Sequence, residues 1–403
     1  MRKFPIFLSA LCVAFSLFGC SKKSESGDGN SNAQNSEVSA QPEELKDFTK
    51  YDLGVYMKPL WLGDIVYNET VMLVGNGDYA PLLYPATEII SVRSYDLSTE
   101  YERGGDYEYD EDLQAIIRGT NKIPYIPLDE YYPPEYILDK CFSCNVPGRP
   151  YIFFAEGSHF SSKQLAVTYR HGGQGRIEAP KCQKQAFSST LSKLENNEPV
   201  KLLFYGDSIT VGANSSGFVE YAPYAPTWTQ MVFDSLTKKY GATNAEYVNT
   251  AVGGWTTRNG ISHVQANVVA HNPDAVFIGF GMNDTAISAR THVEQIKTII
   301  DEIKAANPNV EICLISTMLP NPEVSGVYYE QYTFEAAYEK LIAEYHAQGY
   351  EKICLAPVTS MHQALLQNKR YYDMTGNNVN HPNDFLARAY AQTVFQTVCG
   401  YDQ

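Results

Sequence analysis

Residues 200–210 read VKLLFYGDSIT, and this stretch determines the predicted fold. The apolar run at residues 202–205 is typical of a buried strand, and Gly206 ends it. An acid and a serine follow directly, before a segment that can become helical. A buried parallel strand delivers a nucleophile to the carboxyl edge of its sheet in this way. Ser208 is therefore a candidate nucleophile, although a lone Gly-Asp-Ser also occurs in ordinary strand-ending turns.

The sequence after Leu194 alternates between strand-like and helix-like segments. Further apolar strand runs are expected at residues 246–249, 274–280, 311–316 and 352–356, and amphipathic helices around 293–303, 334–346 and 384–398. Strands that alternate with helices imply a parallel sheet with helices on both faces. We therefore predict an α/β domain over residues 196–403, with every candidate site residue placed after a strand end.

Residues 49–195 have a different pattern, without a helical period. Short apolar runs at 70–74, 88–92, 151–154 and 164–169 are separated by clusters of Gly, Pro, Asp and Asn. This pattern predicts an all-β accessory domain of the sandwich or jelly-roll type.

The first twenty residues have the features of an export signal. A basic head, Met1-Arg2-Lys3, precedes an apolar stretch that is too short to span a bilayer comfortably. The stretch ends in Leu17-Phe18-Gly19-Cys20, which resembles a bacterial lipobox. We expect residues 1–20 to be a lipoprotein signal peptide and residues 21–48 to be a flexible tether. The protein would then be exported and anchored to the bacterial cell envelope through lipid on Cys20.

The composition excludes some classes of partner. A formal net charge of -15 without a basic cluster argues against binding to nucleic acid or to anionic surfaces. Thirty tyrosines could provide platforms for sugar rings, or could serve as strand formers. Both interpretations stay open at the level of sequence.

The spacing of the cysteines indicates structural thiols and a disulfide rather than a metal site. No second cysteine pair or histidine motif completes a metal site around Cys141 and Cys144. In an exported protein, a disulfide among Cys141, Cys144 and Cys182 is expected. Cys313 and Cys354 fall in apolar runs and are predicted to be buried thiols.

Four ordered blocks resemble those of the SGNH or GDSL hydrolases. They are Gly206–Thr210, Asn249–Thr256, Gly281–Asp284 and His381-Pro382. The resemblance implies a flavodoxin-like sheet, Ser208 as nucleophile and His381 as general base, with no metal and no cofactor. It also implies oxyanion donors from the Ser208 and Gly254 backbone and from the Asn283 side chain. Such preorganised donors stabilise the tetrahedral intermediate of acyl transfer.

Asn378 departs from the family pattern, which has Asp three residues before the histidine. An amide can orient the imidazole ring but supplies no charge to stabilise the imidazolium. We therefore predict a Ser-His dyad. His381 would be oriented by the Asn378 side-chain oxygen, by a backbone carbonyl, or by a carboxylate from elsewhere such as Asp373.

The domain order resembles that of carbohydrate esterases that join an amino-terminal β-sandwich to an SGNH domain. The implied activity is removal of O-acetyl groups from polysaccharide through an acyl-serine intermediate. Trp255, Tyr224 and Trp228 are candidate substrate-binding residues. Tyr224 and Trp228 lie in residues 213–229, a segment that is polar and aromatic rather than aliphatic, and Trp255 lies in the second block. Two alternatives stay open: a lipase or thioesterase, and a glycan-binding surface lipoprotein whose hydrolase fold is inert.

Overall fold

The computed structural model describes residues 43–402, apart from residues 121, 174–176 and 328. Residues 43–403 form one compact unit. The predicted signal peptide, Cys20 and residues 21–42 of the predicted tether lie outside the described residues. Residues 43–48 were also predicted to be tether, but they belong to the compact unit, and Phe48 is buried in its core. Within the described part of the chain, no helix combines the length and the apolar character needed to cross a bilayer.

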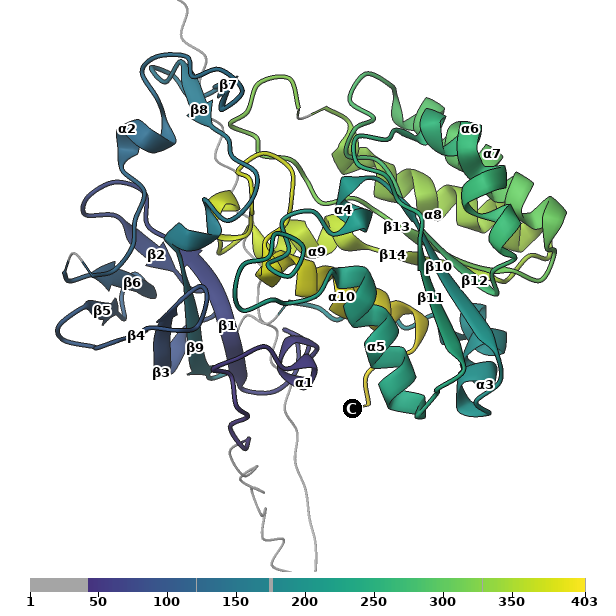
Figure 1. Ribbon diagram of the computed structural model, residues 1–403, viewed down its shortest axis with the longest axis horizontal. Helices are drawn as coiled ribbons and strands as arrows, with labels where there is room; N and C mark the ends of the chain where they lie inside the picture. The colour runs from purple at the N-terminus through teal and green to yellow at the C-terminus, as the bar shows by residue number, and fades with distance from the viewer. Residues whose placement is uncertain (1–42, 121, 174–176, 328, 403) are drawn as a thin grey trace, which may run out of the picture. The chain divides into compact units, whose positions relative to one another are not determined.

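A five-stranded parallel sheet lies at the centre of the carboxyl-terminal part (Figure 1). Its order is β11-β10-β12-β13-β14, with strands at Ala245–Asn249, Val200–Gly206, Ala275–Gly279, Glu311–Ile315 and Ile353–Ala356. This order has the flavodoxin-like pattern, whose switch point lies beside the first strand in the sequence. The predicted α/β class is therefore confirmed. Ligand sites are expected at the carboxyl ends of β10 and its neighbours.

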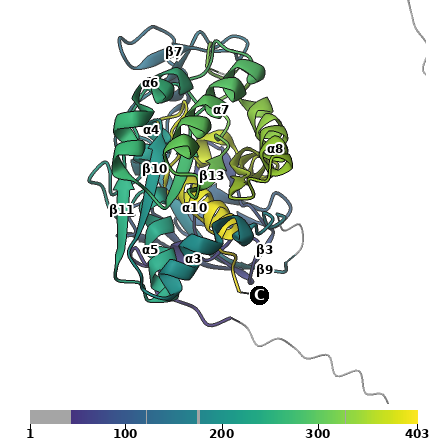
Figure 2. The same ribbon diagram turned by 90° about the vertical axis from the view of Figure 1, so that its right-hand side faces the viewer.

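Helices cover both faces of this sheet (Figures 1 and 2). Side chains alternate along β10, so Leu202 and Phe204 face one layer while Leu203 and Tyr205 face the other. One layer contains α5 (Trp228–Tyr240), α9 (Val358–Leu365) and α10 (Asp384–Val398); the other contains α6 (Thr257–Asn267), α7 (Ala289–Ala306) and α8 (Gln331–Ala347). All four side chains are fully buried, which explains the continuous apolar run in the sequence.

The amino-terminal part is rich in antiparallel strands, as predicted. Its four-stranded sheet has the order β1-β9-β3-β4, with strands at Ile65–Met72, Gln164–His171, Ala86–Ser94 and Glu100–Tyr101. The smaller sheets are β2-β6-β5 (Tyr79–Pro81, Ala115–Arg118, Tyr107–Asp110) and β7-β8 (Cys141–Ser143, Tyr151–Phe153). Helical segments also occur here, at α1 (Leu53–Tyr56), α2 (Leu128–Tyr131), η1 (Ser161–Lys163), η2 (Lys184–Phe187) and α3 (Ser188–Glu195). A sandwich arrangement of these sheets stays a prediction.

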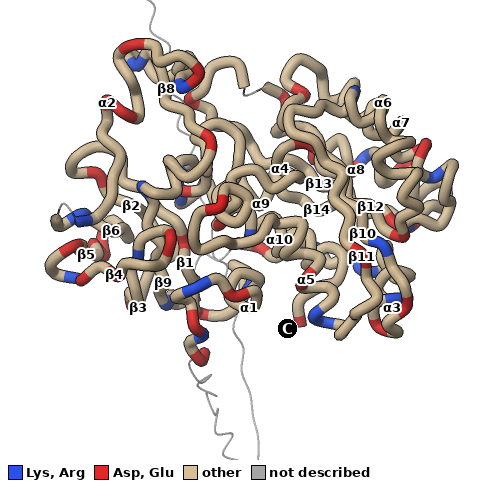
Figure 3. Tube along the Cα trace, viewed as in Figure 1, with Lys and Arg blue, Asp and Glu red and all other residues tan. Residues whose placement is uncertain are grey.

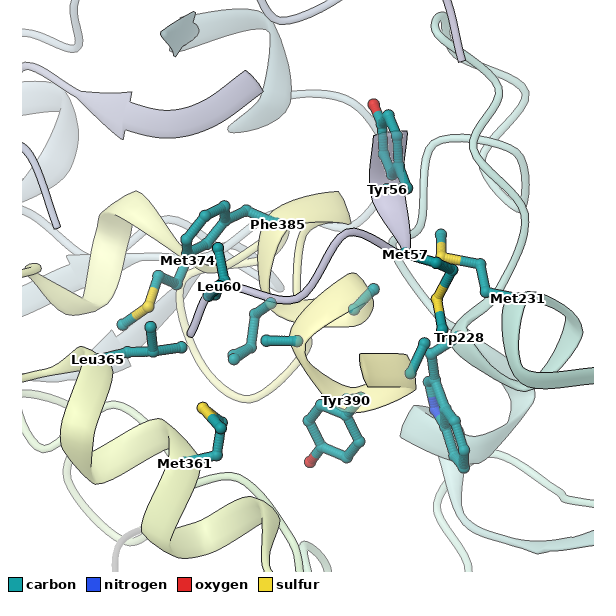
Figure 4. Packing of buried hydrophobic residues seen from close by; sticks show 14 of the residues in the cluster. Tyr56, Met57, Leu60, Trp228, Met231, Met361, Leu365, Met374, Phe385 and Tyr390 are labelled. Atoms are coloured by element: carbon teal, nitrogen blue, oxygen red, sulfur yellow. The ribbon is translucent and has the colours of Figure 1, made fainter. Parts of the chain in front are cut away.

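The β-rich region, residues 49–195, and the α/β region, residues 196–403, contribute to one core. The same buried cluster contains Val71, Leu165 and Tyr169 from the first region and Phe385 and Tyr390 from the second. Figure 4 shows part of this cluster, with Tyr56, Met57 and Leu60 from the first region and Trp228, Met231, Phe385 and Tyr390 from the second. Acidic and basic residues are distributed over both regions (Figure 3).

The predicted disulfide among Cys141, Cys144 and Cys182 was wrong, because all six described cysteines are free thiols. Cys141 begins the extended strand β7, so Cys144 lies about 10 Å further along the chain, beyond the reach of a disulfide. Cys182 lies instead against Gly400 near the carboxyl terminus. Cys313 and Cys354 are buried opposite each other on β13 and β14, as predicted.

Candidate active site

The candidate nucleophile stands where β10 turns into the short helix α4 (Ser208–Val211). Asp207 caps this helix, and its carboxylate accepts the Ile209 N–H at 3.0 Å. Gly206 has no space for a side chain, because a Cβ there would lie 2.2 Å from the Gly279 carbonyl oxygen. The close approach of β10 and β12 therefore requires glycine. It fixes Ser208 at the carboxyl edge of the sheet.

The structure brings His381 to Ser208, as the sequence predicted. The His381 Nε2 atom lies 2.9 Å from Ser208 Oγ, and both residues are 9% exposed. A tight turn holds the histidine, because the Asn377 side-chain oxygen accepts the backbone N–H groups of Val379, Asn380 and His381. A neutral imidazole at this distance can take the Ser208 proton.

The other ring nitrogen of His381 has two acceptors that the sequence did not reveal. Its Nδ1 lies 2.8 Å from Asn214 Oδ1 and 3.3 Å from Glu156 Oε2. Asn214 follows α4, whereas Glu156 lies in the β-rich region between β8 and η1. Neither residue belongs to a motif, so no signal in the sequence could have identified them.

The prediction that Asn378 or Asp373 orients His381 was wrong. The Asn378 side chain accepts from Tyr131 Oη at 3.0 Å and donates to the Phe153 carbonyl at 3.0 Å. The Asp373 carboxylate accepts the Met72 and Arg370 N–H groups. Both side chains are therefore committed to linking the two regions. A carboxylate from elsewhere was one of the predicted alternatives, and Glu156 is such a carboxylate, 3.3 Å from His381 Nδ1.

The predicted oxyanion donors lie on three loops at the same sheet edge. Ser208 is the first residue of α4, where a backbone N–H has no partner within the helix. Gly253, rather than Gly254, is the glycine nearest to Ser208, since a Cβ on Gly253 would lie 3.8 Å from Ser208 Cβ. Gly254 has a φ of +78°, a backbone conformation that glycine adopts without steric cost. The Asn283 side chain donates to the Trp255 carbonyl at 3.0 Å.

A buried Asp-His pair, Asp284 and His292, lies close to these loops. The Asp284 carboxylate accepts the Thr257 N–H at 3.1 Å and contacts His292 Nδ1 at 2.9 Å. His292 Nε2 lies 2.6 Å from Tyr338 Oη. Through these bonds the buried Asp284 carboxylate links its own loop to Thr257, the first residue of α6, and to His292 on α7. It therefore braces the loops that carry the predicted donors Gly254 and Asn283.

Burial also changes the pKa of Asp207, the acid next to the nucleophile. Asp207 is enclosed, and burial raises its pKa to about 7, with a smaller contribution in the same direction from Asp284. The Ile209 N–H bond opposes this shift. Asp207 therefore caps α4 without acting as a fully charged group at neutral pH.

The predicted substrate-binding residues occupy different environments. Trp228 is only 1% exposed, its indole donates to the Ile209 carbonyl, and its ring packs against Phe204 and Tyr390 (Figure 4). Trp228 is thus a core residue, and its predicted contact with substrate was wrong. Tyr224 is 63% exposed, and Trp255 is half-buried next to Gly254. These two residues remain available to a ligand.

Among the described residues, no group of three or more His, Cys, Asp or Glu side chains is arranged to hold a metal ion. A hydroxyl, a base and open backbone donors form the set required for nucleophilic acyl transfer.

Comparison with known proteins identifies a related family. The model of the GDSL-like lipase/acylhydrolase family matches residues 204–389, a segment that includes Ser208, Asn283 and His381. No curated protein matches the chain. The matched segment begins within β10 and ends within α10, so the similarity covers most of the α/β region.

Three solved structures are similar to part of this chain. The acetylxylan esterase Axe2 from Geobacillus stearothermophilus is 18% identical, with a TM-score of 0.42, over 50% of this chain and 95% of that protein. CEX, a two-domain esterase active on acetylated mannans, is 16% identical, with a TM-score of 0.40 over 54% of this chain and 53% of its own. LAE5, an alpha/beta hydrolase from the metagenome of Lake Arreo in Spain, is 19% identical, with a TM-score of 0.39 over 51% of this chain and 99% of its own.

Proposed function

We propose that this protein is a serine ester hydrolase that forms an acyl-Ser208 intermediate. The observation that supports this most directly is the 2.9 Å contact between Ser208 Oγ and His381 Nε2 at the edge of the sheet. The match of residues 204–389 to a GDSL-like acylhydrolase model supports the same reaction class. An inert binding protein would have no need for a nucleophile and base in this arrangement.

The geometry supports a two-step reaction. Ser208 Oγ attacks the carbonyl carbon of the ester while its proton moves to His381 Nε2. The carbonyl oxygen becomes an oxyanion, which the Ser208 N–H, a glycine N–H of residues 253–254 and the Asn283 amide would stabilise. The bond to the alcohol then breaks, and the leaving oxygen takes the proton from Nε2. Water repeats these steps on the acyl-serine, which releases the acid and restores Ser208.

The substrate we propose is a polysaccharide or oligosaccharide that carries O-acetyl groups. Tyr224 and Trp255 provide exposed or half-buried aromatic surface on the loops that follow the nucleophile and β11. Aromatic rings with a polar edge suit contact with sugar rings at a wet surface. We propose a short acyl group because residues 213–229, which follow the nucleophile, are polar and aromatic, whereas a lipase would need aliphatic surface for a long chain.

Substitution of the nucleophile and the base tests this function. Ser208→Ala and His381→Ala should each remove nearly all hydrolysis of para-nitrophenyl acetate, with Tm and circular dichroism close to wild type. Ser262→Ala, which changes an exposed serine on α6, is the matched control and should keep full activity. Release of acetate from acetylated xylan, mannan and pectin then identifies the sugar. Substantial turnover by Ser208→Ala would refute the assignment.

We also propose that the protein is exported and held at the cell envelope by lipid on Cys20, because Leu17–Cys20 resembles a lipobox. A single cysteine carries that anchor, so Cys20→Ser should move the protein from the membrane fraction to the soluble exported fraction. Fractionation followed by immunoblotting measures this. Retention of Cys20→Ser in the membrane fraction would show that another feature holds the protein there.

A further inference from the structure

We propose that Glu156, from the β-rich region, is the carboxylate that stabilises the His381 imidazolium in the reaction of Ser208. The proposal rests on the proposed esterase function and adds a positioning residue to it. Glu156 acts through His381 and does not touch the reacting atoms. In consequence, residues 196–403 would hold the nucleophile and the base but lack the negative charge that supports them.

The segment that carries Glu156 is bound to the α/β region at three points. Asn378 donates to the Phe153 carbonyl at 3.0 Å, Asn377 donates to Glu156 Oε1 at 3.1 Å, and Asn214 donates to the Gly157 carbonyl at 3.2 Å. Two of these asparagines belong to the turn that holds His381. These hydrogen bonds therefore hold both the Glu156 carboxylate and the His381 turn in place.

The two acceptors at His381 Nδ1 have different abilities. Asn214 Oδ1 is nearer, at 2.8 Å, and fixes the ring in the tautomer that leaves Nε2 free to accept a proton from Ser208. Its amide has no charge, so it gains little when the ring becomes positive. Glu156 Oε2, at 3.3 Å, forms an ion pair with the protonated ring. The amide thus orients the base, and the carboxylate stabilises the charge that develops in the transition state.

The surroundings favour a charged Glu156. Burial alone would raise its pKa, but the hydrogen bond and charge of His381, together with the Asn377 and Asn214 amides, lower the pKa below its ordinary value. Two other acids lie on neighbouring elements. Asp207 is buried beneath Ser208, and the Asp384 carboxylate accepts the Ser216 N–H. Of these three acids, only Glu156 contacts the ring.

The expected loss of kcat on removal of the Glu156 charge depends on the solvent exposure of its side chain. In a buried triad, replacing the carboxylate by an amide lowers turnover about ten-thousandfold. The Glu156 side chain is 52% exposed, so solvent screens part of its interaction with the ring. We therefore expect a loss of roughly ten- to a hundredfold in kcat when the charge is removed.

The test compares Glu156→Gln with Glu130→Gln. Glu130 is the matched control, because it also lies in the β-rich region, is partly exposed and pairs with a histidine, His159. Glu156→Gln should lower kcat by the factor given above. It should also move the acid limb of kcat/KM toward lower pH, because the neutral amide no longer stabilises the protonated imidazole. Glu130→Gln should change neither quantity.

Three results would overturn the proposal. The first is Glu156→Gln with kcat within about twofold of wild type. The second is a lower kcat with the acid limb unchanged, which indicates a merely structural role. The third comes from NMR titration of the His381 ring, which needs no substrate: the protonation midpoint should fall in Glu156→Gln relative to wild type, and an equal midpoint contradicts the ion pair. If the midpoint falls but wild type hydrolyses no ester, the esterase function fails while the pairing stands.

Discussion

At the scale of single residues, the turn that carries His381 depends on asparagine side chains. Asn377 binds three successive backbone N–H groups, and Asn378 binds Tyr131 and the Phe153 carbonyl. Asn378 also has a φ of +68°, a conformation that asparagine tolerates better than most residues. Asn378 therefore serves to join the turn to the β-rich region.

Asn378→Ala is expected to reduce stability more than catalysis. Its removal leaves Tyr131 Oη and the Phe153 carbonyl without a buried partner, which costs about 1–3 kcal/mol in the free energy of unfolding. Turnover should fall by roughly tenfold or less, a loss of at most about 1.4 kcal/mol in transition-state stabilisation. Urea denaturation and steady-state kinetics measure the two effects.

Asn378→Gly provides the matched control, because it removes the same amide while tolerating the positive φ. It should be more stable than Asn378→Ala by up to about 1 kcal/mol. If Asn378→Ala stays folded and is as inactive as His381→Ala, then Asn378 takes part in catalysis and our structural interpretation is wrong.

At the scale of elements, one buried ion pair joins β1 to the segment after α9. Lys369 Nζ donates to Glu69 Oε1 at 2.6 Å and to the Thr70 carbonyl at 2.8 Å, and both side chains are fully buried. Glu69 also accepts from Tyr169 Oη and from the Leu83 N–H. The carboxylate is thus surrounded by donors, but Lys369 supplies the only opposite charge among them.

Lys369→Met should be strongly destabilising. It removes the cation that is hydrogen-bonded to the buried Glu69 carboxylate, and removal of one partner from a buried pair costs about 3–5 kcal/mol in the free energy of unfolding. The double variant Glu69→Gln with Lys369→Met should recover part of this loss, since no unpaired charge then remains. Chemical denaturation of the three proteins tests both statements. A loss below about 1 kcal/mol for Lys369→Met would mean that the pair does not hold β1 in place.

At the scale of the whole molecule, the sequence predicted what depends on local pattern. The apolar run of β10 and the alternation after residue 194 predicted the parallel sheet, and residues that follow strand ends share one edge of such a sheet. Ser208 could be placed at that edge for this reason, whereas its pairing with His381 was implied by the resemblance of the four ordered blocks to SGNH hydrolases. Their roles in catalysis stay predictions that the experiments above test.

The features that sequence could not provide depend on packing between distant segments. Glu156 and His381 are 225 residues apart, and no periodicity or motif relates a loop of the β-rich region to this turn. Trp228 suggested a sugar platform by its residue type alone, but its position at the start of α5 directs the indole toward the Ile209 carbonyl in the core. Side-chain direction at a helix start depends on the tertiary structure, which composition does not reveal.

The central claim is that Ser208 is a nucleophile activated by His381. Labelling with a fluorophosphonate, followed by peptide mass spectrometry, tests this most directly because it identifies the reacting atom without knowledge of the natural ester. We predict one modified residue, Ser208, with labelling slowed strongly in His381→Ala and unchanged in Ser262→Ala. Modification of a different residue in the wild-type protein, or no modification under conditions that label other serine hydrolases, would contradict the claim.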